Sequence, residues 1–128
     1  MFRSALVAFA LAASLAAPAL AFTASNGLPV KDEGNGTFYV GYHGESGATA
    51  FWCAAAQYGT QALGLRLTDH IWRVSPPPRR AGEGIRFSVR PEGAAQSSGL
   101  LHFGGEAADL SISHALEFCS KPADMLKE

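Results

Sequence analysis

Two cysteines are the residues of this chain with the most reactive chemistry. Cys53 lies in the stretch FWCAAAQYG, after two aromatic residues and before three alanines, and Cys119 lies near the end of the chain. A thiolate can act as a nucleophile, whereas two thiols in an oxidising compartment form a disulfide. The location of the protein therefore decides which chemistry applies.

The first 21 residues predict export. A single cation, Arg3, precedes an apolar run from Ala5 to Ala17, and Pro18 with the small-x-small pattern Ala19-Leu20-Ala21 follows. These are the parts of a secretory signal peptide, and the run is shorter than the ~20 residues of a spanning helix. We expect residues 1–21 to be removed, and residues 22–128 to form one domain in the periplasm or outside the cell, without stable membrane insertion.

An exported address favours a disulfide between Cys53 and Cys119. Closing a loop of about 66 residues would restrict the unfolded chain by roughly 4 kcal/mol. The alternative is catalytic: the order of Cys53 on a helix and His102 on a later strand resembles that of papain-like hydrolases of cell-wall peptides. However, the residues around Cys53 differ from that family's cysteine motif, and no third residue that would orient His102 can be named. We therefore predict the disulfide, no catalytic residues and, as the leading interpretation, a non-enzymatic protein.

The four histidines show no spacing typical of metal ligands. They are His43, His70, His102 and His114, and no two of them have the i, i+4 spacing that places two imidazoles on one helix face. We predict neither a metal site nor a cofactor.

The leading hypothesis about function rests on the arginines. All six arginines after Arg3 fall within residues 66–90, a window that contains two acids. Without Arg3 the chain has nine Lys and Arg against eleven Asp and Glu, which does not favour nucleic-acid binding. The planar guanidinium group suits bidentate binding of carboxylate or phosphate. We predict that five arginines bind an acidic protein or an anionic envelope polymer; the alternative is that they are solvated charges. They are Arg73, Arg79, Arg80, Arg86 and Arg90.

The alternation of apolar residues and the turn residues predict an α+β fold. We expect a small antiparallel sheet of about five strands, one long helix and a short C-terminal helix attached by the disulfide. The long helix should begin at a Ser46 cap and stop at Gly64. The short one should begin near Ser111 or Ser113 and end before Pro122. The strands are expected at residues 28–30, 37–43, 65–75, 84–90 and 100–103.

This pattern also predicts where the arginines point. If Trp72 and Val74 face the core together with Phe87, then Arg73, Arg86 and Arg90 share the outer face of one hairpin. Arg79 and Arg80 would lie in its loop, PPPRRAGE. The two stretches FWCAAAQYG and SPPPRRAGEGIRFSV together resemble a pattern in small uncharacterised exported proteins of alphaproteobacteria. That resemblance implies export and the disulfide, and it implies no activity.

Overall fold

A computed structural model describes residues 21–44, 47–100 and 107–120. Ser46, His102 and all of the expected signal peptide except Ala21 lie outside these residues. None of the helices in the described ranges is both long and apolar enough to span a bilayer. The elements, in chain order, are β1 (Phe22–Thr23), β2 (Pro29–Gly34), β3 (Thr37–Val40), α1 (Ala48–Gln61), β4 (His70–Arg73), β5 (Ile85–Ser88), β6 (Asp109–Ser111) and α2 (Ile112–Glu117).

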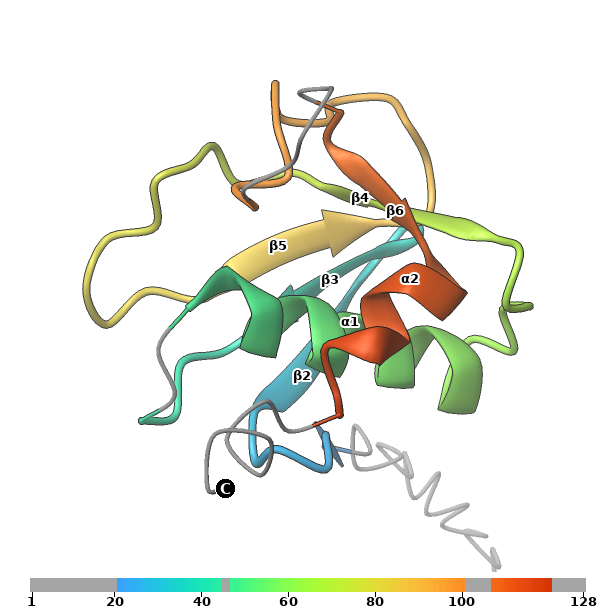
Figure 1. Ribbon diagram of the computed structural model, residues 1–128, viewed down its shortest axis with the longest axis horizontal. Coiled ribbons are helices and arrows are strands. Elements are labelled where there is room, and N and C mark those ends of the chain that lie inside the picture. Colours follow the sequence, from blue (N-terminus) through green and yellow to red (C-terminus); the bar gives the residue numbers. More distant parts are fainter. Residues whose placement is uncertain (1–20, 45–46, 101–106, 121–128) are drawn as a thin grey trace, which may run out of the picture.

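The strands form one antiparallel sheet, which confirms the predicted α+β class. Its order is β1-β2-β3-β5-β4-β6, so it contains six strands rather than about five. The β2–β3 connection is a tight turn, in which Asn35 adopts a positive φ of 55° between two glycines that do the same. Both helices pack on the same side of the sheet (Figure 1).

The core lies between this face of the sheet and α1. Phe38 and Phe87 are direct cross-strand partners, and both side chains are fully buried. Trp52 of α1 packs its ring edge-on against Phe87, with 4.8 Å between the ring centroids. The alanine-rich helix approaches the sheet closely because its small residues leave room. Residues 51–56, including Cys53, are all buried, so the helix is covered on more than the single apolar stripe that the sequence indicates.

The predicted disulfide joins the two helices. Cys53 in α1 is bonded to Cys119, which follows α2, and the Cys53 side chain is only 1% exposed. The predicted cap of α2 is also confirmed, because the Ser111 hydroxyl accepts the backbone N–H of His114 at 3.2 Å. A helix of six residues is too short to be stable alone, so its packing against α1 and the covalent bond hold it in place.

The predicted element boundaries need correction in several places. The expected strand at residues 65–75 is shorter, since β4 covers only His70–Arg73. The expected strand at residues 100–103 has no strand residue at Leu100, and the rest lies outside the described part of the chain. Two short strands, β1 and β6, were not predicted. Gly47 precedes α1 without a side-chain cap, and Gly64 adopts the left-handed conformation three residues after the helix ends.

Candidate functional site: an arginine pocket beside the β4–β5 loop

The loop between β4 and β5 encloses a pocket at one end of the sheet. This loop extends from the sheet at the left of Figure 1. The pocket has a volume of about 710 Å³. We call it the arginine pocket, because four arginines line it; its lining residues are Tyr39, Arg73, Ser75, Pro76, Pro77, Pro78, Arg79, Arg80, Glu83, Gly84 and Arg86.

Arg73 is the buried arginine of this lining, so the prediction that it faces outward is wrong. Its side chain is 1% exposed, and its cross-strand partner is Phe87. Directly opposed residues project to the same face of a sheet, so Arg73 shares the core-facing side with Phe87. Trp72 consequently lies on the other face, half-buried, although its size favoured a core position in the sequence.

The guanidinium group of Arg73 is held by backbone carbonyls. Its Nε donates to the Ser75 carbonyl at 2.7 Å, and its Nη1 donates to the Ser98 carbonyl at 3.1 Å. The remaining Nη2 atom is buried and has no hydrogen-bond partner among the described residues. Burial and, to a smaller extent, the nearby charge of Arg79 lower the pKa of Arg73. The site therefore contains a desolvated cation with one unsatisfied nitrogen.

Arg79 is held in place by contacts other than an ion pair with any acidic side chain of the described ranges. Its Nη1 donates to the carbonyls of Arg80 and Glu83, at 3.1 and 2.8 Å. Its Cζ lies 4.8 Å from the centre of the Phe51 ring and 5.5 Å from that of Tyr42. Such cation–π contacts and carbonyl bonds orient the guanidinium group but leave its charge uncompensated.

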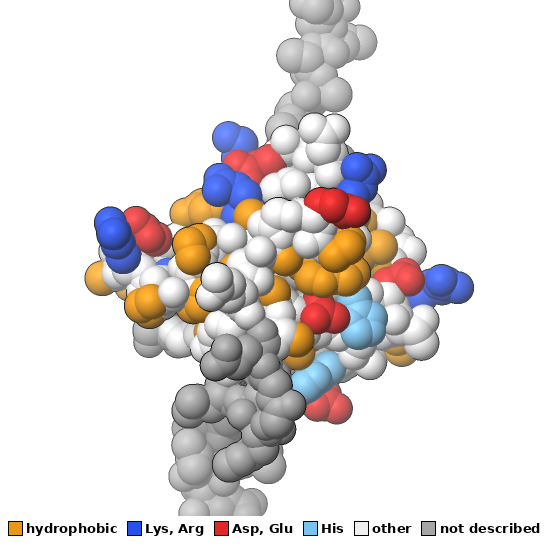
Figure 2. Space-filling view, turned by 90° about the horizontal axis from the view of Figure 1, so that it is seen from above, with side chains coloured by type: hydrophobic (Ala, Val, Ile, Leu, Met, Phe, Trp, Pro, Cys, Tyr) orange, Lys and Arg blue, Asp and Glu red, His pale blue; other side chains and the backbone are white. Residues whose placement is uncertain are grey.

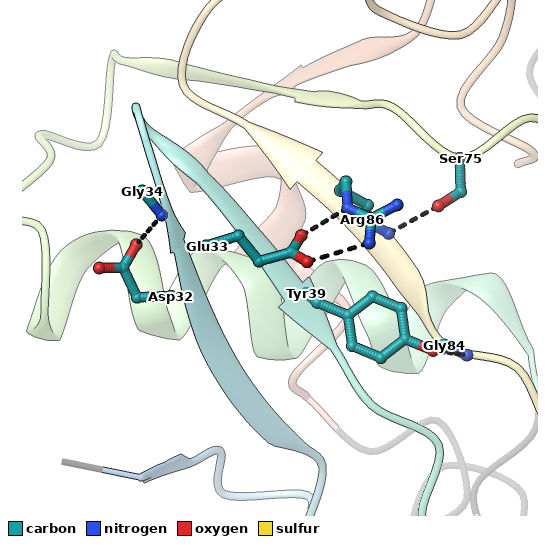
Figure 3. A network of polar contacts seen from close by, with 7 residues as sticks. All are labelled: Asp32, Glu33, Gly34, Tyr39, Ser75, Gly84 and Arg86. Atoms are coloured by element: carbon teal, nitrogen blue, oxygen red, sulfur yellow. Dashed lines mark hydrogen bonds and ion pairs between the residues drawn. The ribbon is translucent and has the colours of Figure 1, made fainter. Parts of the chain in front are cut away.

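Arg86 is paired with a carboxylate from a neighbouring hairpin. Its Nε and Nη2 donate to the two carboxylate oxygens of Glu33, the second at 3.0 Å (Figure 3). This bidentate hydrogen bonding lowers the pKa of Glu33 and raises that of Arg86. The guanidinium group also lies 5.5 Å from the centre of the Tyr39 ring. Arg86 thus lines the pocket, but two of its donor nitrogens are already bonded to Glu33.

Tyr39 and Gly84 hold the return of the loop in place. The Tyr39 hydroxyl accepts the backbone N–H of Gly84 at 2.7 Å (Figure 3). A Cβ atom at residue 84 would lie 2.8 Å from that hydroxyl oxygen and would also meet the Val40 carbonyl. Glycine is therefore required at residue 84, because neighbouring atoms approach its Cα too closely for a side chain.

The remaining arginines differ in their relation to the pocket. Arg80 is exposed and lines the pocket, and the described residues provide no side-chain partner for it. Arg90 is exposed but is not part of the lining, so the structure brings together four of the five predicted arginines. Arg66 lies outside as well and pairs with Asp69 at 3.4 Å. Basic side chains at the edges of the face in Figure 2 lie next to acidic ones.

The sulfur and histidine chemistry lies elsewhere. The sulfur of Cys53 is bonded to that of Cys119, so neither is a free thiol. His70 contacts Asp109 through Nδ1 at 2.8 Å on the outer face of the sheet. Within the described ranges, no three His, Cys, Asp or Glu side chains lie close enough to hold a metal ion.

Three contributors to the site were missed from the sequence. Glu33, Tyr39 and Gly84 come from different strands or loops, and they meet only through the register in which Tyr39 opposes Arg86. No local spacing in the sequence signals that these residues meet.

Comparisons with protein-family models, curated proteins and solved structures gave no match to this chain. The function must therefore be argued from the geometry of the arginine pocket.

Proposed function

We propose that this is an exported, non-enzymatic binding or accessory protein of the periplasm, and that its arginine pocket binds an anionic partner. The observation that carries the proposal is the convergence of four arginines on one pocket, in whose lining Glu83 is the one acid among the residues that the structure describes. Guanidinium groups in a concave, partly desolvated site attract oxyanions more strongly than scattered surface charges do. The partner is an acidic protein or an anionic envelope polymer.

Export is part of the proposal. The apolar leader with its small-x-small ending supports it, and so does the disulfide, which persists in oxidising compartments. We expect the intact mass of protein recovered from a periplasmic fraction to lack residues 1–21. A mass that retains the leader would contradict this part and leave the binding proposal to be tested separately.

The binding test compares two pairs of charge-neutralising substitutions. Arg79→Gln with Arg80→Gln removes two charges from the pocket, whereas Arg66→Gln with Arg90→Gln removes two charges outside it. The probes are poly-L-glutamate, standing for an acidic protein, and dextran sulfate, standing for an anionic polymer. Retention of each variant on the immobilised probes is measured at low and high salt, after circular dichroism has shown that both variants are folded.

The expected result is weaker retention of the pocket variant alone. Retention of the wild-type protein should also fall as salt rises, because an electrostatic contact is screened within about 10 Å at 0.1 M ionic strength. Equal retention of both variants would mean that net charge governs binding, and no retention of the wild-type protein would mean that these partners are wrong. The first outcome would remove the arginine pocket from the proposed function, and the second would remove these two classes of partner.

A further inference from the structure

Arg73 distinguishes the arginine pocket from an ordinary charged surface, because its guanidinium group is buried. A buried guanidinium group is ordinarily compensated by a carboxylate or by a full set of acceptors, because an uncompensated buried charge is expensive. Here two carbonyl bonds are present, one nitrogen remains unsatisfied, and no described carboxylate pairs with the group. Gly99 packs against it so closely that an added Cβ would lie 3.2 Å from Cζ, so the side chain is firmly positioned.

The charges around the pocket indicate the charge that a ligand should carry. Four guanidinium groups line it, and the acids in contact with them or in the lining are Glu83 and Glu33. Four positive against two negative charges leave an excess of two positive charges among the described residues. A carboxylate would neutralise half of this excess. A phosphate group, with a charge of about −1.5 to −2 at pH 7, would neutralise most of it.

The dimensions favour a compact head group over a polymer that lies along the surface. Pockets for small molecules have volumes of about 300–1,000 Å³, and the 710 Å³ of the arginine pocket falls in this range. Its prolines and the ring of Tyr39 offer apolar walls beside the cations, which suits a group carrying a short organic portion.

We propose that the arginine pocket binds one phosphate head group, held between Nη2 of Arg73 and the guanidinium group of Arg80. This inference rests on the proposed function and narrows it to a chemical class. Glu33 limits the affinity, because its carboxylate keeps a negative charge at Arg86, beside the lining of the pocket. Since Nη2 is covered in the unliganded protein, the lining around Arg73 must shift slightly when the phosphate enters.

The experiment is a titration of the ¹⁵N-labelled, disulfide-intact protein with inorganic phosphate, followed by NMR. The backbone amides of Ser75, Arg79, Gly84 and Arg86 should shift in one saturable process. Arg80→Gln should weaken binding about threefold to fivefold, as expected for one exposed charged contact. Arg73→Met should weaken it about tenfold or more, the factor for a lost charge-assisted hydrogen bond. Thermal melting shows whether this second variant is folded; if it is not, Arg80→Gln decides alone.

Two control substitutions separate the site from general electrostatics. Arg66→Gln should leave the affinity unchanged. Glu33→Gln should tighten binding, whereas Glu92→Gln, which removes an exposed acid outside the lining, should not. If Glu33→Gln and Glu92→Gln increase the phosphate affinity equally, Arg86 and Glu33 are not part of the ligand site. Linear, unsaturated shifts up to tens of millimolar phosphate, or shifts that Arg80→Gln leaves unchanged, would overturn the inference.

The source of the phosphate is distinguished by two further probes. Glycerol 3-phosphate tests a small phosphomonoester, and vesicles of phosphatidylcholine with phosphatidic acid test a lipid head group. Binding of phosphate without retention on poly-L-glutamate or dextran sulfate would support this inference and contradict the broader polymer partner. Retention on those polymers without phosphate binding would contradict this inference alone.

Discussion

Opening the bond between Cys53 and Cys119 should strongly destabilise the protein. The bond closes a loop with a sequence separation of 66 residues. In the chain-entropy treatment, its removal stabilises the unfolded state by roughly 4 kcal/mol. Domains of this size are stable by only about 5–15 kcal/mol, so roughly a quarter to four fifths of the total depends on this one bond.

The position of α2 adds a structural consequence. The helix has six residues, and it contacts α1 where Ile112 approaches Gly59, whose added Cβ would lie 3.0 Å from the Ile112 side chain. Without the covalent bond the helix is held by the core packing of Ile112 and Ala115, by backbone hydrogen bonds from the N–H groups of Ile112 and Ser113 to the loop before β4, and by the pairing of β6. We expect the amides of α2 to exchange with deuterium much faster after reduction, and before the sheet unfolds.

The assay is guanidinium chloride unfolding of the oxidised protein, the reduced protein and a Cys53→Ala/Cys119→Ala variant. A loss of about 4 kcal/mol corresponds to a fall in the midpoint of about 1 M or more for a protein of this size. The alanine variant should match the reduced protein and should not respond to reductant, which controls for other effects of the reagent. Midpoints of oxidised and reduced protein within a few tenths of a molar would refute the reasoning.

Three further predictions concern the pocket. Gly84→Ala should destabilise the protein by about 1–3 kcal/mol or more, because the added carbon meets the Val40 backbone carbonyl as well as the Tyr39 hydroxyl, whereas Tyr39→Phe should cost only about 1 kcal/mol for the lost hydrogen bond; chemical denaturation measures both. Arg86 lowers the pKa of Glu33, so this pair stabilises the fold above the ordinary pKa of a glutamate and the contribution is lost as pH falls through the lowered value; the stability difference between wild type and Glu33→Gln should therefore shrink on acidification through that range, and a constant difference would be evidence against the pair. Arg73→Met should leave the melting temperature unchanged or raise it, since it removes a buried unsatisfied nitrogen, and a large fall would show that the two carbonyl bonds outweigh that penalty.

The elements governed by local patterns could be predicted from the sequence. The apolar spacing through Phe51 and Trp52 indicated the long helix, and Ser111 has the side chain that caps a helix start. The cysteine pair followed from the expected compartment rather than from geometry. The short strands β1 and β6 gave no usable signal, because two or three residues are too few to show alternation.

The candidate site was only partly predictable, for physical reasons that Arg73 illustrates. Tryptophan is the more apolar residue, so assigning Trp72 to the core and Arg73 to the surface was the natural choice. The observed phase is set by Ile71, which is fully buried, and by pairing with Phe87; both place Arg73 on the inner face. The clustering of arginines in the sequence did identify the loop, but the unsatisfied nitrogen and the occupation of Arg86 depend on tertiary contacts.

The central claim, that the arginine pocket is an anion site, is tested most directly by locating an anion in it. Crystals of the disulfide-intact protein soaked in selenate, a heavier oxyanion similar in shape to phosphate, would reveal bound anions in an anomalous difference map. The account predicts a peak within hydrogen-bonding distance of Nη2 of Arg73 and of the Arg80 guanidinium group. Peaks found only at Arg66 or Arg90, with the arginine pocket empty at saturating selenate, would contradict it.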